Sequence, residues 1–233
     1  MQLSKRLQAV ADLVTPGSRL ADVGTDHGYV PIWLYEQGII PSAIAMDLRE
    51  GPLNRAKENI AVHDLSDGIT VRLSDGLEKL LSGEADSIVI AGMGGILVKK
   101  ILSQGKEILD SVQELILQPQ SDLDVVRQYL CDIGFTIVRE DMVFEDGKYY
   151  PMMKAVHGED IANRKVWLLF GRFLLENRHP VLEKYLEKED EGCQILLEKL
   201  GQASSDAARR RMEELLQYRG LIKEALAYYR GDT

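Results

Sequence analysis

The residues best suited to chemistry begin with an acid that stands just before a glycine-rich turn. Asp22 is followed by Gly24 and Gly28, with three residues between the two glycines. Turns that bind dinucleotides carry the spacing Gly-x-Gly-x-x-Gly instead. A carboxylate at Asp22 would repel the pyrophosphate of NAD, whereas it would attract the ammonium and sulfonium groups of S-adenosylmethionine. The charge and the spacing together predict a site for the cationic cofactor.

Acidic residues also close the next two predicted strands. Asp47 follows Asp22 by 25 positions, where a carboxylate can accept hydrogen bonds from both hydroxyl groups of a ribose. Asp75 and Gly76 end the third strand, where the acid can bond an adenine amino group while the glycine keeps the backbone close. Three successive strand ends therefore carry acids suited to one adenosine-containing ligand.

The central predicted strand ends in a glycine-rich run, residues 91–95 (Ala-Gly-Met-Gly-Gly). Methyltransferases that act on exocyclic amines often place an acid or Asn here, followed by two prolines and an aromatic residue. This chain has neither the proline pair nor the aromatic residue, which argues against amine methylation. The backbone groups of the run suit a planar base edge and the methionine moiety. Residues 118–120 (Gln-Pro-Gln), at the next strand end, are candidates for the opposite wall.

The elements that must position these residues alternate between apolar strands and helices up to about residue 157. Continuous apolar strands of this kind are typical of a parallel sheet covered on both faces. We expect strands at 18–24, 42–47, 69–76, 86–95 and 114–120. We expect helices at 32–38, 51–65, 96–103 and 123–134, and a short helix between the third and fourth strands.

Two strand-like runs close this region, at residues 135–156, and the turn 145–148 between them contains an Asp-Gly pair that fits a tight hairpin. Class I methyltransferases commonly end their sheets with an antiparallel hairpin, so the analogy favours that fold. The predicted fold is therefore α/β, a Rossmann-like class I methyltransferase sheet with a terminal antiparallel hairpin.

From residue 163 onward the strand signals stop and three helical patterns follow, at 163–179, 180–202 and 204–230. The last two carry apolar stripes that predict an antiparallel, coiled-coil-like hairpin. The stripes consist of Leu182, Leu186, Ile195, Leu196 and Leu200, facing Met212, Leu215, Leu216, Leu221, Ile222 and Leu226. We expect two domains, a cofactor-binding domain at 1–160 and an α-helical coiled-coil-like domain at 161–233.

The net charge of −9 is unevenly distributed. Residues 162–233 carry 13 Lys and Arg against 12 Asp and Glu, whereas the rest of the chain carries 15 against 25. An acidic total does not exclude RNA, but it requires that any RNA contact be a local basic patch. The candidates are Arg209 to Arg211, which a solvated helix face explains equally well, and the pair Lys5 and Arg6.

Cysteine and histidine usage gives no sign of a metal site. Cys131 and Cys193 are far apart, and the histidines show no ligand spacing, so we expect no metal. No apolar run approaches the roughly 18 residues that a membrane span needs. The N-terminus lacks the apolar segment of a secretory signal. These features predict a cytoplasmic protein with reduced thiols and no membrane partner.

The motifs, their order and the helical tail together resemble the bacterial tRNA adenine-N1 methyltransferases that act on adenosine 22 in the D-arm. The resemblance covers nearly the whole chain and rests on DVGTDHGYVP, the MD pair at 46–47, LSDGL, IAGMGG, LQPQ, the KYYPMM hairpin and the tail. It implies S-adenosylmethionine as cofactor, tRNA as partner, and a tail that helps to hold the tRNA. It also implies transfer of a methyl group to ring N1 of an adenine.

Methylation at N1 needs alignment and charge stabilisation, because adenine N1 already carries an in-plane lone pair and positive charge moves from sulfur to the base. A hydrogen-bond acceptor near N6 would favour that cation, and Asp26 or a backbone carbonyl at 92–93 is the candidate. Tyr29, or the hairpin's Tyr149 and Tyr150, could stack on a flipped adenine, and His27 could contact cofactor or base. The expected catalytic residues are Asp26, His27 and Tyr29.

Simpler explanations stay open for two of these residues, since Tyr29 could pack in the core and His27 could bond only a backbone carbonyl. The expected cofactor-binding residues are Asp22, Gly24, Thr25, His27, Gly28, Asp47, Leu48, Asp75, Gly76, Gly92, Met93 and Gly94.

Three other functions remain open at this point. An NAD-dependent Rossmann oxidoreductase is disfavoured by Asp22, by the glycine spacing and by the terminal hairpin. A non-catalytic module would recruit a protein partner through the apolar stripes of its tail. A methyltransferase could also act on a small molecule or a protein. We expect a monomer or a weak dimer in each case.

Overall fold

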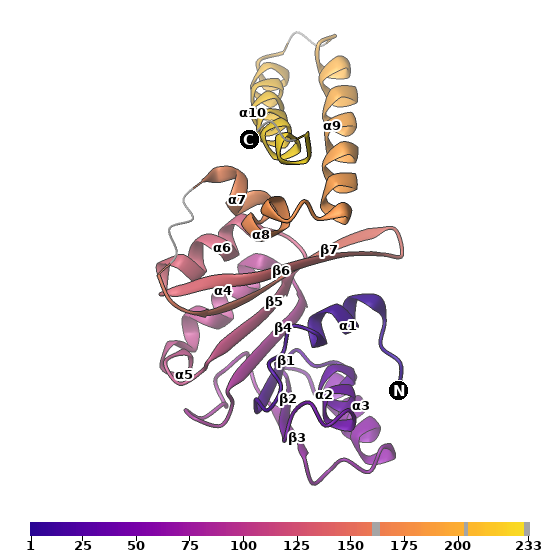
Figure 1. Cartoon of the computed structure of the whole chain (residues 1–233), viewed down its shortest axis with the longest axis vertical. Coiled ribbons are helices and arrows are strands. Elements are labelled where there is room, and N and C mark those ends of the chain that lie inside the picture. The colour runs from indigo at the N-terminus through magenta and orange to yellow at the C-terminus, as the bar shows by residue number, and fades with distance from the viewer. Residues whose placement is uncertain (160–163, 203–204, 231–233) are drawn as a thin grey trace. The chain divides into compact units, whose positions relative to one another are not determined.

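The computed structural model describes residues 1–159, 164–202 and 205–230. The chain forms two compact units, Met1–Ile161 and Ala162–Thr233. Figure 1 shows a sheet flanked by helices in the first unit and helices alone in the second. No helix in the described ranges has the length and apolar character needed to cross a membrane.

The first unit is built on a seven-stranded sheet whose order is β3-β2-β1-β4-β5-β7-β6. Strands β1 to β5 are parallel, and β7 runs antiparallel to both β5 and β6. The strand order reverses between β1 and β4, which is the point where open α/β sheets bind their ligands. The strands are β1 (Leu20–Val23), β2 (Ala43–Asp47), β3 (Ile69–Leu73), β4 (Ser87–Met93), β5 (Glu114–Pro119), β6 (Phe135–Glu145) and β7 (Lys148–His157).

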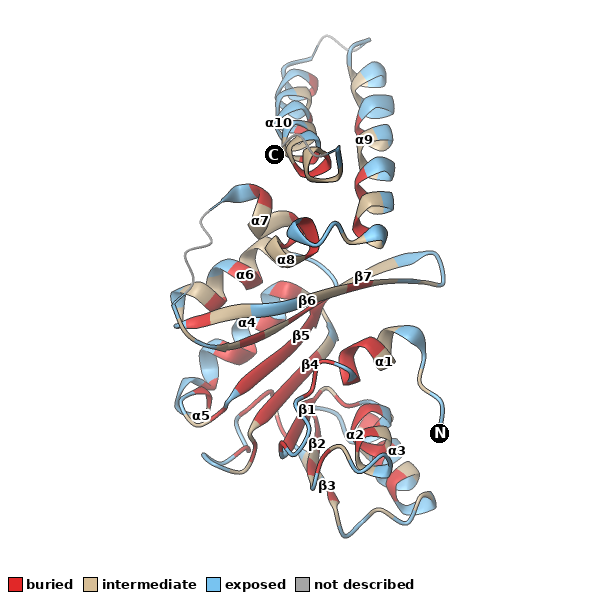
Figure 2. Ribbon diagram, in the orientation of Figure 1, coloured by how far each residue is buried: buried red, intermediate tan, exposed pale blue. Residues whose placement is uncertain are grey.

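Helices cover both faces of this sheet (Figure 1). One face packs α1 (Lys5–Ala11), α2 (Tyr29–Glu36) and α3 (Glu50–Val62), and the other packs α4 (Gly95–Gln104), α5 (Lys106–Leu109) and α6 (Leu123–Asp132). Successive residues of a strand point to opposite faces, so the central strands feed both cores and are buried along their length (Figure 2). The predicted Rossmann-like sheet with its terminal hairpin is confirmed.

The hairpin turn is the predicted one. Glu145 pairs with Lys148, and the two residues between them, Asp146 and Gly147, have φ angles of 48° and 76°. Two consecutive positive φ angles define the tight turn that matches the twist of the flanking strands. The turn therefore closes β6 and β7 into a hairpin whose pairing shifts register once, between Ile137 and Arg139.

Short helices were the least predictable elements of the fold. The short helix expected between β3 and β4 is wrong, because the described backbone there forms only turns. The four-residue α5 had no signal in the sequence. The pattern at 163–179 is interrupted at Gly171, whose φ is 90°, which separates α7 (Lys165–Phe170) from α8 (Arg172–Glu176).

The second unit ends in two long helices, α9 (Pro180–Leu200) and α10 (Asp206–Arg230). They run antiparallel, because Arg219 Nε donates to Asp190 Oδ1 at 2.6 Å and the Tyr229 hydroxyl donates to the carbonyl of His179 at 2.9 Å. Their helical hairpin is observed, whereas a true coiled-coil geometry stays a prediction. Three positions assigned to the apolar stripes are exposed, namely Ile195, Leu196 and Leu216 at 46%, 46% and 54%.

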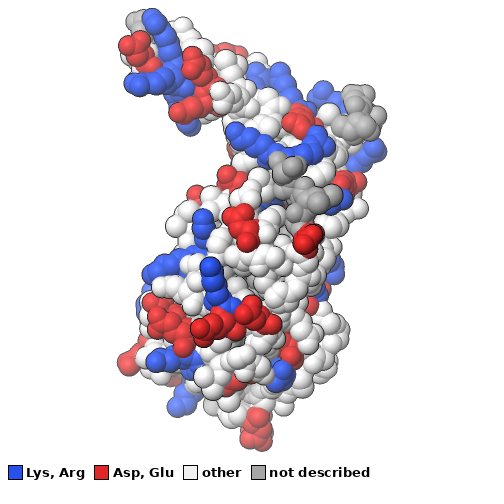
Figure 3. Space-filling model, turned by 90° about the vertical axis from the view of Figure 1, so that its left-hand side faces the viewer, with Lys and Arg blue, Asp and Glu red and all other residues white. Residues whose placement is uncertain are grey.

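The basic cluster of α10 is partly neutralised within its own helix. Arg209 lies 3.6 Å from Asp206, and Arg211 lies 2.8 Å from Glu214. Figure 3 shows basic and acidic side chains side by side on the surface of this unit. The arrangement favours the solvated-face explanation of the cluster over a dedicated phosphate track.

Candidate functional site

A cavity of about 610 Å³ opens where the carboxyl ends of β1 to β5 meet. Its size is in the range of small-molecule sites. Twelve of the fourteen predicted site residues line it: Asp22, Gly24, Thr25, Asp26, His27, Tyr29, Asp47, Leu48, Asp75, Gly76, Gly92 and Met93. The order of strands in the sheet thus brings together side chains that are up to 71 positions apart in the sequence.

The other two predicted residues, Gly28 and Gly94, do not line the cavity. Gly28 is the N-cap of α2 and packs its Cα side against Ala56, and Gly94 is the N-cap of α4. These glycines shape the helix entries rather than offering a surface to a ligand. Their direct contact with the cofactor, expected from the sequence, has no support in this geometry.

The hairpin tyrosines are also outside the cavity lining. Tyr149 packs against Phe144, with ring centroids 4.6 Å apart, and Tyr150 lies under the guanidinium of Arg6 at 5.5 Å from its ring centroid. Tyr29 is therefore the candidate aromatic platform that the fold leaves at the cavity.

Asp22 is the buried charge of the site, since only 5% of the residue is exposed. Burial raises the pKa of Asp22 to about 6, a hydrogen bond from Thr25 Oγ1 at 2.5 Å opposes that rise, and the nearby charge of Asp47 adds to it. Within the described residues no Lys or Arg lies within ion-pair distance of this carboxylate. A ligand that brings a positive charge would therefore stabilise the ionised form.

The glycine-rich turn does not offer its first amides to a ligand. The N–H groups of Gly24 and Thr25 both donate to the carbonyl of Met46, at 2.8 and 2.9 Å. A phosphate-binding turn needs such amides free, so this backbone does not suit a pyrophosphate. Gly24 has a φ of 77°, and a β-carbon placed there would collide with the tip of the Met93 side chain. Glycine is therefore required by the conformation of the turn, whereas the flexible end of Met93 could move aside.

Asp47 lies beside this turn at the end of β2, almost fully buried. Its Oδ1 accepts a hydrogen bond from the backbone N–H of Arg49 at 2.9 Å, and the Arg49 side chain lies 4.0 Å away. The next residue, Leu48, is 60% exposed at the cavity. A carboxylate fixed beside an exposed apolar side chain suits a ribose and the flat face of its base.

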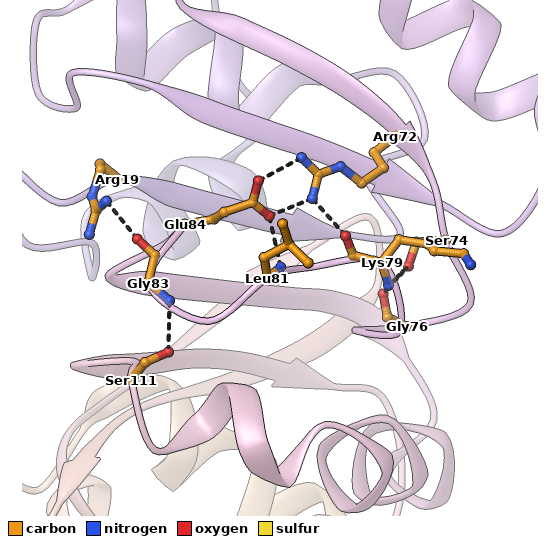
Figure 4. Close-up of polar contacts among 9 residues, drawn as sticks. All are labelled: Arg19, Arg72, Ser74, Gly76, Lys79, Leu81, Gly83, Glu84 and Ser111. Carbon is orange, nitrogen blue, oxygen red and sulfur yellow. Dashed lines mark hydrogen bonds and ion pairs between the residues drawn. The ribbon is translucent and has the colours of Figure 1, made fainter.

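The loop that follows β3 places Asp75 and Gly76 at the cavity. Figure 4 shows the polar contacts of Ser74, Gly76 and Lys79 that hold this loop. Ser74 Oγ donates to the carbonyl of Gly76 at 2.9 Å and accepts from the N–H of Lys79 at 3.1 Å. Two hydrogen bonds from the Arg72 guanidinium bind Glu84, which anchors the far side of the loop. These hydrogen bonds fix the loop and so hold Asp75 at the cavity.

The end of β4 carries a β-bulge. Ala91 pairs with Gln118 and Met93 pairs with Pro119, so Gly92 is the extra residue, with a φ of 80°. Bulges of this kind occur next to active sites, where they redirect the backbone. A β-carbon at Gly92 would lie 3.6 Å from Arg6 Nη1 and 3.9 Å from Gln120 Nε2. The bulge thus faces two side-chain hydrogen-bond donors.

The predicted catalytic residues share one corner of the cavity. The rings of His27 and Tyr29 are stacked, with centroids 5.0 Å apart and planes 8° from parallel. Tyr29 is 37% exposed, so the alternative that it packs in the core is wrong. Asp26 has a φ of 51° and its carboxylate lies 2.7 Å from Arg55 Nη2. Arg55 therefore occupies one oxygen of Asp26, which was expected to accept a hydrogen bond from N6 of the target adenine.

Residues that the sequence did not assign to the cofactor site complete the wall. They come from α1 and α4, and they are Arg6, Leu7, Leu97 and Ile101. Arg6 was expected only as part of an RNA patch, which would lie near the cofactor loop if the first helix packed on the sheet edge. Gln118 is buried and bonds Arg6, whereas Gln120 lines the cavity. In the described ranges no group of three or more His, Cys, Asp or Glu is arranged to hold a metal.

Comparison with known proteins agrees with this architecture. Residues 3–153 match the model of a family described as a methyltransferase domain. The tRNA (adenine(22)-N(1))-methyltransferase of Bacillus subtilis strain 168 is 34% identical over 232 residues, which cover 97% of this chain and 98% of that protein.

Solved structures give the same result. The crystal structure of the B. subtilis m1A22 tRNA methyltransferase has a TM-score of 0.88 and 35% identity, over 97% of this chain and 99% of that one. A Streptococcus pneumoniae protein solved in complex with S-adenosyl-L-methionine has a TM-score of 0.87 and 38% identity, over 97% of this chain and all of that one. The similarity therefore extends over both units.

Proposed function

Because this chain belongs to the tRNA (adenine(22)-N(1))-methyltransferase family, we propose that it methylates ring N1 of adenosine 22, in the D-arm of tRNA, with S-adenosylmethionine as cofactor. The observation that carries the proposal is the buried carboxylate of Asp22 at the cavity, whose pKa burial raises to about 6. An NAD-dependent oxidation is disfavoured by the same acid and by the engaged amides of Gly24 and Thr25.

The cavity residues fit the proposed cofactor group by group. Asp22 supplies a negative charge for the ammonium, Asp47 supplies acceptors for the ribose hydroxyls, and Asp75 supplies an acceptor for the adenine amino group. Leu48 and Leu97 add exposed apolar surface at the same cavity. When bound, the cofactor supplies a methyl group activated by its positively charged sulfur.

The roles of the chain's own residues follow from the chemistry of adenine N1. No general base is needed, since the attacking lone pair is already free, so the protein must orient the base and tolerate its positive charge. The stacked His27 and Tyr29 offer an aromatic surface for the flipped adenine. The acceptors for its N6 amino group are the backbone carbonyls around Gly92 and Met93 and the part of Asp26 that Arg55 leaves free.

The arrangement into a cofactor-binding domain and a tRNA-holding helical domain is part of this proposal, as are a cytoplasmic location and a monomer or weak dimer. A tRNA substrate supports the cytoplasmic location. The helical unit carries acidic side chains beside its basic ones, so it suits tRNA binding only at local sites. The polar cluster of α10 is thus a secondary contact at most.

The experiment that tests the proposal is incubation of the protein with labelled cofactor and unmodified tRNA, followed by nucleoside analysis. We expect 1-methyladenosine, and we expect none when adenosine 22 is replaced by another nucleoside. Transfer of the label to a protein or a small molecule with none in tRNA would contradict the proposal.

A further inference from the structure

The cavity is also lined by one cationic side chain that none of the three predicted acids, Asp22, Asp47 and Asp75, neutralises. This side chain belongs to Arg6, on α1. The Arg6 guanidinium donates from Nη1 to Gln118 Oε1 at 2.9 Å and lies over the ring of Tyr150. Both partners are uncharged, and among the described residues no carboxylate lies within ion-pair distance of this guanidinium.

This unit has six other arginines, and of these only the exposed Arg49 and Arg139 also lack a carboxylate closer than 4.0 Å in the described ranges. Partners at 2.5–2.8 Å neutralise four of them, namely Arg19 with Asp86, Arg55 with Asp26, Arg72 with Glu84 and Arg127 with Glu140. A half-buried guanidinium at a cavity is costly unless an anion completes its hydrogen bonds. The charge of Glu145 acts on Arg6 only from beyond ion-pair distance, so a close counter-charge must come from a ligand, either the α-carboxylate of the cofactor or a phosphate of the substrate.

The β-bulge at Gly92 indicates where an anion would bind. Arg6 Nη1 and Gln120 Nε2 converge on the space that a side chain at position 92 would fill. Two N–H donor groups at one point suit the oxygens of an anion. The methylated adenine is a cation, so a guanidinium in contact with the base would oppose the product. The anionic part of the substrate is its sugar-phosphate backbone.

The position of Arg6 is itself enforced from a distant part of the chain. Glu145, at the tip of the β6–β7 hairpin, accepts hydrogen bonds from the backbone N–H groups of Lys5 at 2.7 Å and Arg6 at 3.2 Å. These are the unsatisfied amides of the first turn of α1, and a carboxylate there is favoured by the helix dipole. The hairpin tip therefore holds α1 so that Arg6 reaches the cavity.

We propose that Arg6, held by Glu145 and assisted by Gln120, binds the backbone phosphate next to the target adenosine and so positions that nucleotide for methyl transfer. This proposal rests on the proposed function, because it takes tRNA as the substrate. Arg6 is a positioning residue for the base and a binding residue for the phosphate.

The test compares Arg6→Gln and Arg6→Lys with the wild-type protein, using unmodified tRNA transcript as the probe. Steady-state rates give kcat and KM, and tRNA binding is measured by anisotropy across a series of salt concentrations. Arg6→Gln is expected to lower kcat/KM for tRNA by about tenfold and to reduce the slope of log affinity against log salt by about 1, the value of one phosphate contact. Arg6→Lys should restore the slope, because it keeps the charge.

Cofactor affinity, measured by calorimetry, should be unchanged in both variants. Weaker cofactor binding in Arg6→Gln with an unchanged salt slope would assign Arg6 to the carboxylate of the cofactor and contradict the proposal. The matched control is Lys106→Gln, which removes one exposed positive charge on α5, away from the cavity lining, and should leave the slope as in the wild type. An unchanged slope in Arg6→Gln, or an equal loss in Arg6→Gln and Arg6→Lys, would overturn the proposal.

The two proposals fail in different ways. If the wild type binds tRNA but transfers no methyl group to it, the proposed function fails, and the salt slopes still decide the role of Arg6. If the wild type does not bind tRNA at any salt concentration, both are overturned.

Discussion

The sheet carries a buried acid at each end, and the two acids differ in whether a positive charge lies beside them. At the carboxyl end, Asp22 is buried with only a hydroxyl partner, and its pKa is raised to about 6. At the amino end, Glu114 is equally buried, but Lys154 lies 2.6 Å away and Thr15 donates two hydrogen bonds to it. Burial alone would raise the pKa of Glu114, but these partners outweigh it and hold the pKa below its ordinary value.

The difference separates an acid that serves the fold from one that serves a ligand. Glu114 joins β5 to β7 and to the loop after α1, so its charge is used within the chain. Asp22 has no such use and remains an uncompensated charge until a cationic ligand arrives. Three measurements test whether Asp22 serves the ligand and Glu114 the fold, and a fourth tests a contact outside both ends.

The largest effect is expected from Asp22→Asn. Removing the charge that faces the ammonium should weaken cofactor binding by about a hundredfold or more, in line with the loss of one partner of a buried pair. The folded-state pKa lies above that of the unfolded chain, so ionisation destabilises the fold as pH rises from about 4 to 6. The variant should therefore gain on the order of 2–3 kcal/mol of stability at pH 7.5.

Calorimetric titration and thermal unfolding of the ligand-free protein measure the two halves of this prediction. The stability gain should vanish at pH 4, where the wild-type acid is also protonated. A variant that is less stable than the wild type at pH 7.5 would show that Asp22 has a structural partner after all.

Glu114→Gln should lower the stability of the protein and leave its cofactor affinity nearly unchanged, the reverse of Asp22→Asn. It leaves the half-buried Lys154 without its counter-charge, which costs about 3 kcal/mol of unfolding free energy. Cofactor affinity should stay within about twofold of wild type, because Glu114 lies at the other end of the strands from the cavity. Chemical denaturation and cofactor titration under one set of conditions provide the measurement. A stable variant with weak cofactor binding would erase the distinction between the two ends.

The pH dependence of cofactor affinity should reflect Asp22 directly. Below pH 6 the ligand-free acid is protonated and must release its proton on binding, so Kd should rise about tenfold per pH unit. Above pH 7 the acid is ionised and Kd should be flat. Titrations in buffers of different ionisation enthalpy detect the released proton. Equal affinities at pH 5 and pH 7.5 would be incompatible with this assignment.

Glu145→Ala tests a contact outside both ends and should have the smallest effect. Loss of the two hydrogen bonds to the first turn of α1 should lower kcat/KM for tRNA by a few-fold, with cofactor affinity unchanged. Asp146→Ala, at the neighbouring turn position, disturbs the hairpin without touching α1 and is the control. Equal losses in the two variants would assign the effect to the hairpin in general.

The main elements of the fold were predictable because the forces that define them are local in the sequence. Buried parallel strands read as continuous apolar runs, and the Asp146–Gly147 pair marked the hairpin turn. The failures have a common cause in tertiary packing. The exposure of Leu196 and Leu216 depends on how two helices meet, and α5 is too short to leave a periodic signal.

The same distinction explains what could be predicted of the site. Asp22, Asp47 and Asp75 could be grouped from the sequence because each follows a strand, and parallel strands end at one edge. Arg6 could be placed near the cofactor loop only on the assumption that the first helix packs on the sheet edge, because Glu145, which holds that helix, is 139 positions away. The ion pair between Asp26 and Arg55 could not be predicted from the sequence either, because Arg55 lies on the next helix, α3.

The hydrogen bonds from Gly24 and Thr25 to Met46 also limit how this scaffold could be redesigned. Replacing Asp22 with a neutral residue would remove the repulsion of a dinucleotide, but the amides that a pyrophosphate needs would still be bound to β2. A change of cofactor class would require a different backbone path for the turn, with insertions or deletions between β1 and α2. Point substitutions alone are therefore a poor route between the two classes, whether in the laboratory or in evolution.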